Sequence, residues 1–438
     1  MSIPESVEGI WKPPNYSFDD EPIIASYIRG EDIARVAGPS CNPDTYFWRN
    51  IAWSPDGTHL LGQSDDHHLN LFRLDDDKLE YVFSVHAPTT LLSFAWYPFA
   101  RQDDPQTWCF AIGARDVTIK LIDAYQGRTR ATYGIIDHTE RFKGPQSMAF
   151  SLDGTKLYCA HDSFLSIASL DKPGVYSHTS IRLTPSPRAT RKGKAAAGQK
   201  GVISTITVTS DHLTGSTNDL VAIGTFAGTV GIYQIKGEAI TDAEQLCLLG
   251  WKEEGSNGIA QIAFHPPVPH ILFVTSRRAS VIRAYDLRYV GSRRSFMHPA
   301  AEVALIGILQ CQSERNEKRM ESQQRIHFHL DWAGRYLISG NKTGEVCLWD
   351  VRSPESELET PQNALIPPLT RWKAAEDAIP AVAFHPSHPV VVVASGSRFW
   401  KSVDSKEDDV EFEDEKSLTY TVPDAALRLF KVSSDPIM

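Results

Sequence analysis

Apolar and polar residues alternate along much of the chain in short runs, a pattern typical of half-buried β-strands. Residues 337–352, "LISGNKTGEVCLWDVR", show it well: two apolar runs flank the turn residues 341–344. Gly344 can adopt a positive φ without a Cβ clash, so the chain can reverse there. In the second run Val346 faces one side of the strand and Trp349 the other. One hairpin cannot bury either face, so the pattern predicts a unit that packs against further copies.

The same strand–turn–strand pattern occurs seven times. The units cover 50–74, 92–123, 146–170, 203–235, 261–288, 327–352, and 381–398 completed by 426–432. Their anchors are 43 to 66 residues apart, namely Trp53, Trp96, Phe150, Val208, Phe264, Leu330 and Phe384. WD repeats recur about every 40–45 residues, and each forms one four-stranded propeller blade. The sequence therefore predicts an all-β fold, a seven-bladed WD-repeat β-propeller with loop insertions.

The ring needs a strand to close it. The last unit supplies three strands, and the segment 23–28, "IIASYI", lies ahead of the first unit and can supply the outer fourth. We therefore expect a flexible N-terminal segment at 1–22, a propeller at 23–433 and a C-terminal tail at 434–438. Structural roles are expected for residues at blade anchors, turns and third-strand ends, namely Trp53, His265, Arg288, Gly344, Trp349 and Asp350.

Composition narrows the class of protein. The 438 residues carry a formal charge of −10, so any nucleic-acid binding must come from local basic patches. The six cysteines are scattered without a CxxC pair, which favours free thiols in a reducing compartment. The N-terminus has no apolar signal-peptide core, and the longest apolar run, 389–394, is too short to span a membrane. We expect no membrane association and a monomer.

Two inserts have strong and opposite charge. Residues 182–200 contain six basic residues and no acids, whereas residues 404–415 contain eight acids and one lysine. Both are typical of flexible loops. The basic insert is also compatible with a nuclear-import signal or an RNA contact. Candidate RNA-binding residues come from this insert and from the arginine-rich fifth unit: Arg188, Arg191, Lys192, Lys194, Arg277, Arg278, Arg293 and Arg294.

Enzyme signatures are not found in the sequence. It has no GxSxG, HExxH, P-loop or dinucleotide fingerprint. His327 and His329 lie two apart on one expected strand, but no third metal ligand is evident. We therefore expect a non-enzymatic scaffold with no cofactor and no metal.

Four stretches in this order resemble the telomerase Cajal body protein family of WD-repeat proteins. They are "NIAWSPDGTHLL", "QSMAFSLDGTKLYCA", "QRIHFHLDWAGRYLISGNKTGEVCLWD" and "AFHPSHPVVVVASGSR". The resemblance covers roughly residues 25–433 and implies a nuclear protein of Cajal bodies. It implies binding to small Cajal body RNAs and telomerase RNA, together with box H/ACA ribonucleoproteins, and a fungal branch of the family is tied to splicing. We expect the chain to lack the long N-terminal region of the animal members, and no motif transfers an RNA-reading residue by position.

Two other functions stay open. "WDVR" at 349–352 and "YDLR" at 285–288 fit the Trp-Asp-x-Arg type of signature that resembles substrate receptors of cullin-type ubiquitin ligases. A generic protein-interaction propeller without RNA is the third possibility, because loops on a rigid ring commonly bind partners.

Overall fold

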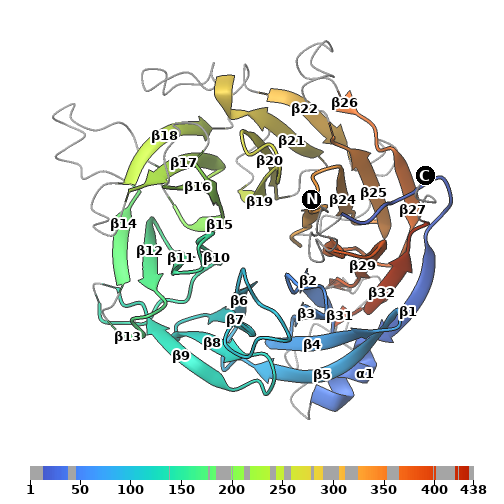
Figure 1. Ribbon diagram of the computed structural model, residues 1–438, viewed down its shortest axis with the longest axis horizontal. Coiled ribbons are helices and arrows are strands. Elements are labelled where there is room, and N and C mark those ends of the chain that lie inside the picture. The colour runs from blue at the N-terminus through green and yellow to red at the C-terminus, as the bar shows by residue number, and fades with distance from the viewer. Residues whose placement is uncertain are drawn as a thin grey trace, which may run out of the picture.

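The fold is a ring of seven β-sheets around a central axis (Figure 1). The computed structural model describes residues 13–37, 46–137, 139–175, 178–183, 199, 201–211, 218–236, 243–250, 258–277, 281–289, 305–310, 324–352, 365–397, 399–400, 420–422 and 424–433. Within these residues no helix has the length and apolar character needed to cross a membrane. The predicted all-β, seven-bladed propeller is confirmed.

Each blade is an antiparallel sheet whose first strand lies nearest the axis. Blades 1 to 3 comprise β2 (Trp48–Trp53), β3 (His59–Ser64), β4 (His68–Asp75), β5 (Lys78–His86); β6 (Leu91–Trp96), β7 (Cys109–Ala114), β8 (Ile119–Asp123), β9 (Thr129–Gly134); and β10 (Ser147–Phe150), β11 (Lys156–Ala160), β12 (Phe164–Ser169), β14 (His178–Arg182).

Blades 4 to 6 follow the same order. They comprise β15 (Ile203–Ser210), β16 (Asp219–Thr225), β17 (Thr229–Ile235), β18 (Ala243–Gly250); β19 (Ile259–Phe264), β20 (Ile271–Ser276), β21 (Val281–Asp286), β22 (Leu305–Gln310); and β23 (Phe328–Leu330), β24 (Tyr336–Gly340), β25 (Glu345–Asp350), β27 (Thr370–Lys373). A 3₁₀ turn, η2 (Leu287–Tyr289), follows β21. Two short strands each pair in parallel with the outer strand of the preceding blade, β13 (Gly174–Val175) on β9 and β26 (Leu365–Ile366) on β22.

The seventh blade closes the ring, as the sequence predicts. It consists of β28 (Ala381–Phe384), β29 (Val390–Ala394), β32 (Ala426–Lys431) and, outermost, β1 (Ile23–Arg29) from the other end of the chain. The antiparallel β1–β32 register runs from Ile23 opposite Lys431 to Arg29 opposite Ala426, and Figure 1 shows blue β1 beside red β32. α1 (Gly30–Ala37) follows β1. A small ladder of β30 (Phe399–Trp400) and β31 (Tyr420–Thr421) stands outside the blades.

Seven hydrophobic cores, one between each pair of neighbouring blades, hold the ring together. Strand β25 shows why one blade cannot stand alone. Val346 and Leu348 enter the core shared with blade 7, whereas Cys347 and Trp349 enter the core shared with blade 5. Both faces of the strand are buried because each packs against a neighbour, and Trp349 is only 1% exposed. Burial of this apolar surface is the main stabilising contribution to the ring.

The residues expected to be structural occupy turns and blade interfaces. Trp53 is buried in the core between blades 7 and 1. Gly344 has φ +81°, and a Cβ there would lie 2.0 Å from the carbonyl oxygen of Ala375, so only glycine fits. Asp350 accepts hydrogen bonds from the backbone N–H and the guanidinium of Arg352.

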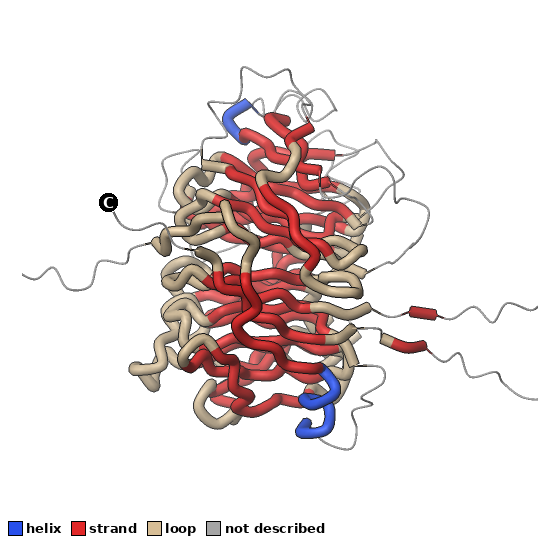
Figure 2. Tube along the Cα trace, turned by 90° about the vertical axis from the view of Figure 1, so that its right-hand side faces the viewer, coloured by secondary structure: helices blue, strands red, loops and turns tan. Residues whose placement is uncertain are grey.

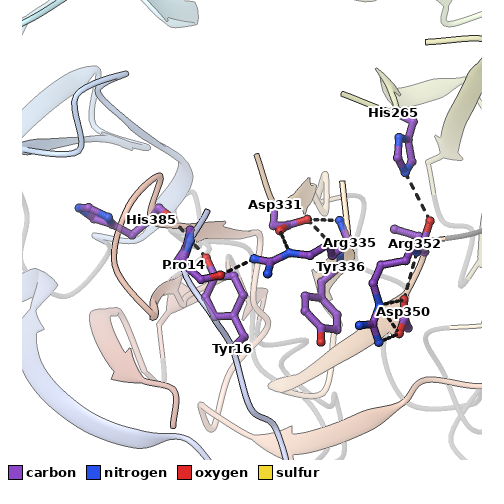
Figure 3. Close-up of polar contacts among 10 residues, drawn as sticks. Pro14, Tyr16, His265, Asp331, Arg335, Tyr336, Asp350, Arg352 and His385 are labelled. Atoms are coloured by element: carbon purple, nitrogen blue, oxygen red, sulfur yellow. Dashed lines mark hydrogen bonds and ion pairs between the residues drawn. The ribbon is translucent and has the colours of Figure 1, made fainter. Parts of the chain in front are cut away.

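Aromatic residues near the N-terminus pack on the ring. Tyr16 is buried against Phe384, with ring centres 5.2 Å apart, and its hydroxyl donates to the carbonyl of His385 at 3.3 Å. The guanidinium of Arg335 donates a hydrogen bond to the carbonyl of Pro14 (Figure 3). This packing differs from the flexible segment expected at 1–22, because Tyr16 finds apolar surface between blades 6 and 7; residues 1–12 lie outside the described part of the chain.

Four of the six cysteines lie in the described residues, where each is buried and none forms a disulfide: Cys109, Cys159, Cys247 and Cys347. Burial raises the pKa of the Cys109 thiol to about 11, so this thiol is a poor nucleophile at neutral pH. Cys41 and Cys311 lie outside the described residues.

Strand direction defines two faces of the disc seen edge-on in Figure 2. We use the name insert face for the face at which the innermost strand of each blade begins and the second strand ends. The strand ends that flank both charged inserts lie there: β14 and β15 flank residues 184–198, and β29 and β32 flank the acidic residues 404–415. The opposite face carries the turns between first and second strands and between third and fourth strands.

Candidate nucleic-acid interface

A central cavity of about 1140 Å³ runs between the innermost strands. Residues of blades 1 to 6 line it. Several polar residues of its wall form hydrogen bonds between neighbouring blades. Gln63 donates to the carbonyl of Leu91 at 2.8 Å, and Gln261 both accepts from the N–H of Phe328 at 2.8 Å and donates to its carbonyl at 2.9 Å. The wall is therefore a rigid frame.

Four arginines line the cavity where it opens at the insert face. Arg49 is the second residue of β2, Arg115 follows β7, Arg277 follows β20, and Arg325 lies three residues before β23. Among the described residues that line the cavity, Asp65 is the acidic one. Its carboxylate lies 3.8 Å from the guanidinium of Arg49. Among the residues that the structure describes, the lining of the mouth thus contains four positive charges and one negative charge.

Two of these arginines lie on one aromatic ring. The guanidinium carbon of Arg277 is 4.5 Å from the ring centre of Phe226, and that of Arg325 is 5.3 Å away. Phe226 follows β16 in blade 4, Arg277 belongs to blade 5, and Arg325 leads into blade 6. Three neighbouring blades therefore bring a half-buried aromatic ring and two cations together, in geometry typical of cation–π contacts.

The electrostatics of the mouth reflect the crowding of like charges. Burial, together with the nearby charges of Arg277 and Arg49, lowers the pKa of Arg325 to about 10. Burial and the charges of Arg325 and Arg49 lower the pKa of His327 to about 3, so this imidazole is neutral at physiological pH. A positively charged cavity mouth of this kind attracts anions.

Of the eight candidate residues predicted from sequence, Arg277 lies in this mouth. The other seven, Arg188, Arg191, Lys192, Lys194, Arg278, Arg293 and Arg294, lie outside the described residues. The strand ends that flank 188–194 are at the insert face: β15 begins next to the cavity-lining Val202, whereas β14 is the outermost strand of its blade. The strand ends that flank Arg293 and Arg294, at Asp286 and Leu305, are at the opposite face.

Sequence reasoning missed four residues of the mouth: Arg49, Arg115, Phe226 and Arg325. Each lies at the start of an innermost strand, just before one, or just after a second strand. Once the start and end of each strand are known, these positions are the ones expected at the mouth. An arginine or aromatic residue at such a position would have indicated the site.

The histidine pair does not form a metal site in the described part of the chain, where no group of three or more histidine, cysteine, aspartate or glutamate side chains gathers. The Nδ1 of His329 accepts a hydrogen bond from the N–H of Phe384 at 3.4 Å.

The two Trp-Asp-x-Arg-like segments place their arginines on their own aspartates. Arg288 pairs with Asp286 at 2.7 Å. Arg352 pairs with Asp350 (Figure 3). Both pairs lie at third-strand ends, at the face opposite the insert face. These short-range pairs satisfy the charges within each blade.

No family model matches the chain. Among curated proteins, it is 26% identical over 407 residues to telomerase Cajal body protein 1 of Mus musculus, a match that covers 89% of this chain and 67% of the mouse protein. Against telomerase Cajal body protein 1 of Homo sapiens it is 26% identical over 408 residues, covering 91% of this chain and 64% of the human protein. A third relative, the guanine nucleotide-binding protein negative regulator 1 of Schizosaccharomyces pombe, is 27% identical over 315 residues, 69% of this chain and 70% of the relative.

The chain thus spans about two thirds of the length of the mammalian relatives, and the matched part includes nearly the whole ring. Matches of this length cannot come from isolated WD turns, because they follow the order of the blades from end to end. They confirm the resemblance to the telomerase Cajal body protein family that the sequence motifs indicate.

Proposed function

We propose that this chain is a non-enzymatic nuclear scaffold that binds small nuclear RNA of the Cajal body type and supports ribonucleoprotein assembly or localisation. Telomerase RNA, H/ACA-type ribonucleoproteins and splicing ribonucleoproteins are its candidate targets. Other proteins would bind its loops on either face of the ring. The names of the mouse and human relatives support a nuclear, Cajal body location for this chain.

The observation that carries the proposal is the concentration of positive charge at the cavity mouth of an otherwise acidic protein. Four arginines surround the cavity mouth, and β15, the strand that follows the basic insert, begins beside it. Phosphate contacts supply most of the affinity of proteins for nucleic acids, and arginine planes and aromatic rings bind unpaired bases. A rigid ring with such a mouth can therefore hold an RNA loop in a fixed position.

The ubiquitin-ligase receptor remains the alternative. Its motif arginines, Arg288 and Arg352, each pair with the aspartate two residues earlier. Such pairing is expected of any blade end, so it gives no specific support to ligase binding.

Ultraviolet crosslinking in cells of the source organism, followed by sequencing of the recovered RNA, tests the proposal. We expect enrichment of structured small nuclear RNAs over messenger RNA of equal abundance. Recovery of cullin-ligase subunits without RNA would favour the receptor, and recovery of neither would favour a protein-interaction propeller.

A further inference from the structure

We propose that the cavity mouth is a nucleotide-binding subsite in which an unpaired RNA base takes the place of one guanidinium on the ring of Phe226, while Arg49, Arg277 and Arg325 bind the adjoining phosphates. This inference rests on the proposed function and assigns its RNA contact to particular side chains. The ligand is a single-stranded segment, because bases in loops can be splayed out and stacked, whereas paired bases cannot.

The arginines at the mouth favour a bound anion. Arg325 lies near Arg277 and Arg49, and its pKa is lowered first by burial and then by the charges of both arginines. The acidic side chain among the described cavity-lining residues, Asp65, pairs with Arg49. Clustered cations repel one another, so the folded state without ligand is destabilised by this arrangement. An RNA phosphate placed among them would offset that repulsion.

Phe226 is held in place before any ligand arrives. It sits in the turn between β16 and β17, where the hydroxyls of Thr225 and Thr229 are hydrogen-bonded at 2.8 Å. The backbone of blade 5 lies against it, since a Cβ on Gly258 would come within 2.7 Å of the Phe226 Cα. A fixed, half-buried ring flanked by guanidinium groups resembles the stacking platforms that bind single-stranded nucleic acids.

The cavity is large enough for the ligand. Its volume of about 1140 Å³ slightly exceeds the roughly 300–1,000 Å³ of ordinary small-ligand sites. One nucleotide and part of its neighbours can therefore enter at the mouth. Polar side chains of the wall that join blades, such as Gln63 and Gln261, need not change partners.

A purely structural role for the arginines makes a different prediction. If Arg325 served only to brace Phe226, its removal would lower the melting temperature of the free protein. If Arg325 is a ligand-binding residue that is repelled by the neighbouring arginines, its removal should leave the melting temperature unchanged or raise it. RNA binding should weaken at the same time, a trade-off that is common at functional sites.

The test uses fluorescence polarisation with a labelled ten-nucleotide single-stranded RNA, the same RNA in a duplex, and the full chain. The variants are Arg325→Met and Phe226→Leu. The control is Arg101→Met, at an exposed arginine in the turn between β6 and β7 on the opposite face, paired with Asp103 at 2.8 Å. Each binding titration is repeated over a range of salt concentrations, and each variant is also melted without RNA.

We expect both mouth variants to bind single-stranded RNA about tenfold more weakly, in keeping with the removal of one stacked base or one bound phosphate. Arg325→Met should also reduce the slope of log K against log salt by about 0.7, whereas Phe226→Leu should leave the slope unchanged because it removes no charge. The control should bind like the wild type.

Wild-type affinity in both mouth variants would overturn this inference and leave the proposed function standing. A fall in melting temperature that parallels the weaker binding would overturn it in favour of a structural role. Absence of RNA binding by the wild-type chain would overturn the proposed function and this subsite together.

Discussion

His385 donates a hydrogen bond from Nε2 to the carbonyl oxygen of Gly57 at 2.8 Å, across the seam where the last blade meets the first. The Nδ1 of the same ring accepts from the backbone N–H groups of Ser387 at 3.0 Å and His388 at 2.9 Å. These three bonds fix the neutral tautomer with its proton on Nε2. The closure of the ring thus depends on side-chain geometry as well as on the β1–β32 ladder.

The same relationship recurs around the ring. His265 of blade 5 contacts blade 6 in this way, with Nε2 donating to the carbonyl of Val351 at 3.3 Å (Figure 3). In both seams the ring lies against a turn glycine with positive φ in the next blade: Gly57 at +78° and Gly334 at +69°. A side chain on either glycine would displace the histidine.

Gly57→Ala should destabilise the seam. The added Cβ would lie 2.5 Å from the His385 ring, and the left-handed backbone would be strained as well. Strain and overpacking each amount to about 1–3 kcal/mol. Gly201→Ala is the control, because Gly201 has a similar positive φ, +88°, but the nearest atom to its added Cβ is the Ala227 Cβ at 3.6 Å. Chemical denaturation should show a larger loss of stability for Gly57→Ala; equal losses would mean that the His385 contact does not stabilise closure.

Acid should weaken the ring through His385. Burial lowers the pKa of His385 from 6.5 to about 4. Well above pH 6.5 the imidazole is neutral in both the folded and unfolded states. Below pH 6.5 the unfolded state binds a proton that the folded state resists, so stability falls until the pH reaches about 4, by at most ~1.4 kcal/mol per pH unit for one such group.

His385→Gln should reduce the dependence of the unfolding free energy on pH between 6.5 and 4. His388→Gln is the control, at the exposed neighbour whose charge also lowers the pKa of His385, and it should reduce this dependence less because burial is the larger cause. Denaturant titrations at several pH values measure both, and an unaltered pH dependence in His385→Gln would show that this histidine is not a source of acid sensitivity.

The number of blades and the closing strand could be predicted because both depend on local sequence. Alternation of apolar residues identifies strands, and turn residues such as those at 341–344 place their ends. The Phe-His-Pro turns of His265 and His385 were visible in the sequence too. Their hydrogen bonds to Val351 and Gly57 were not, because each bond joins blades whose relative position only the closed ring determines.

Trp349→Ala should destabilise the whole ring. The side chain is 1% exposed between blades 5 and 6, and its Nε1 donates to the carbonyl of Ile366 at 3.2 Å. Truncation of a buried tryptophan lowers stability by about 3–5 kcal/mol. Trp332→Ala, at a 43% exposed tryptophan of the same blade, is the control. Thermal melts should separate the two variants clearly, and similar melting temperatures would contradict the packing of blade 6.

The acidic insert should be dispensable for folding. Residues 404–415 lie outside the described part of the chain, and their eight acids oppose compact packing. Replacement by a short Gly/Ser linker between β30 and β31 should shift the melting temperature little, because loop-closure entropy changes by only about 0.6 kcal/mol per doubling of length. Failure of this variant to yield soluble protein would mean that the insert packs on the ring.

The candidate site was less accessible to sequence reasoning than the fold. Arg277 stood out because it lies in an arginine-rich unit. Phe226 and Arg325 did not, because they are far apart in the sequence and meet only after blades 4, 5 and 6 have packed. Charge counts along the chain identify inserts in which charged residues are close together in sequence. The cavity mouth instead consists of single arginines from separate blades.

The proposed function requires that positive charge on the insert face binds a structured small RNA. The most direct measurement is a polarisation titration of a small nuclear RNA hairpin against salt, for the wild-type chain and two variants. The first variant changes Arg188, Arg191, Lys192 and Lys194 together. The second changes Arg277 and Arg325 together, the two arginines that lie on Phe226 at the cavity mouth.

We predict specific wild-type binding, with a slope against log salt that falls by about 0.7 for each phosphate that a variant no longer neutralises. The first variant should weaken binding to all sequences alike, because a flexible basic loop touches phosphates. The second should also alter sequence preference, since Arg277 is held against Phe226 on the rigid frame. Binding by both variants with the wild-type affinity and slope, or no specific binding by the wild type, would contradict the proposed function.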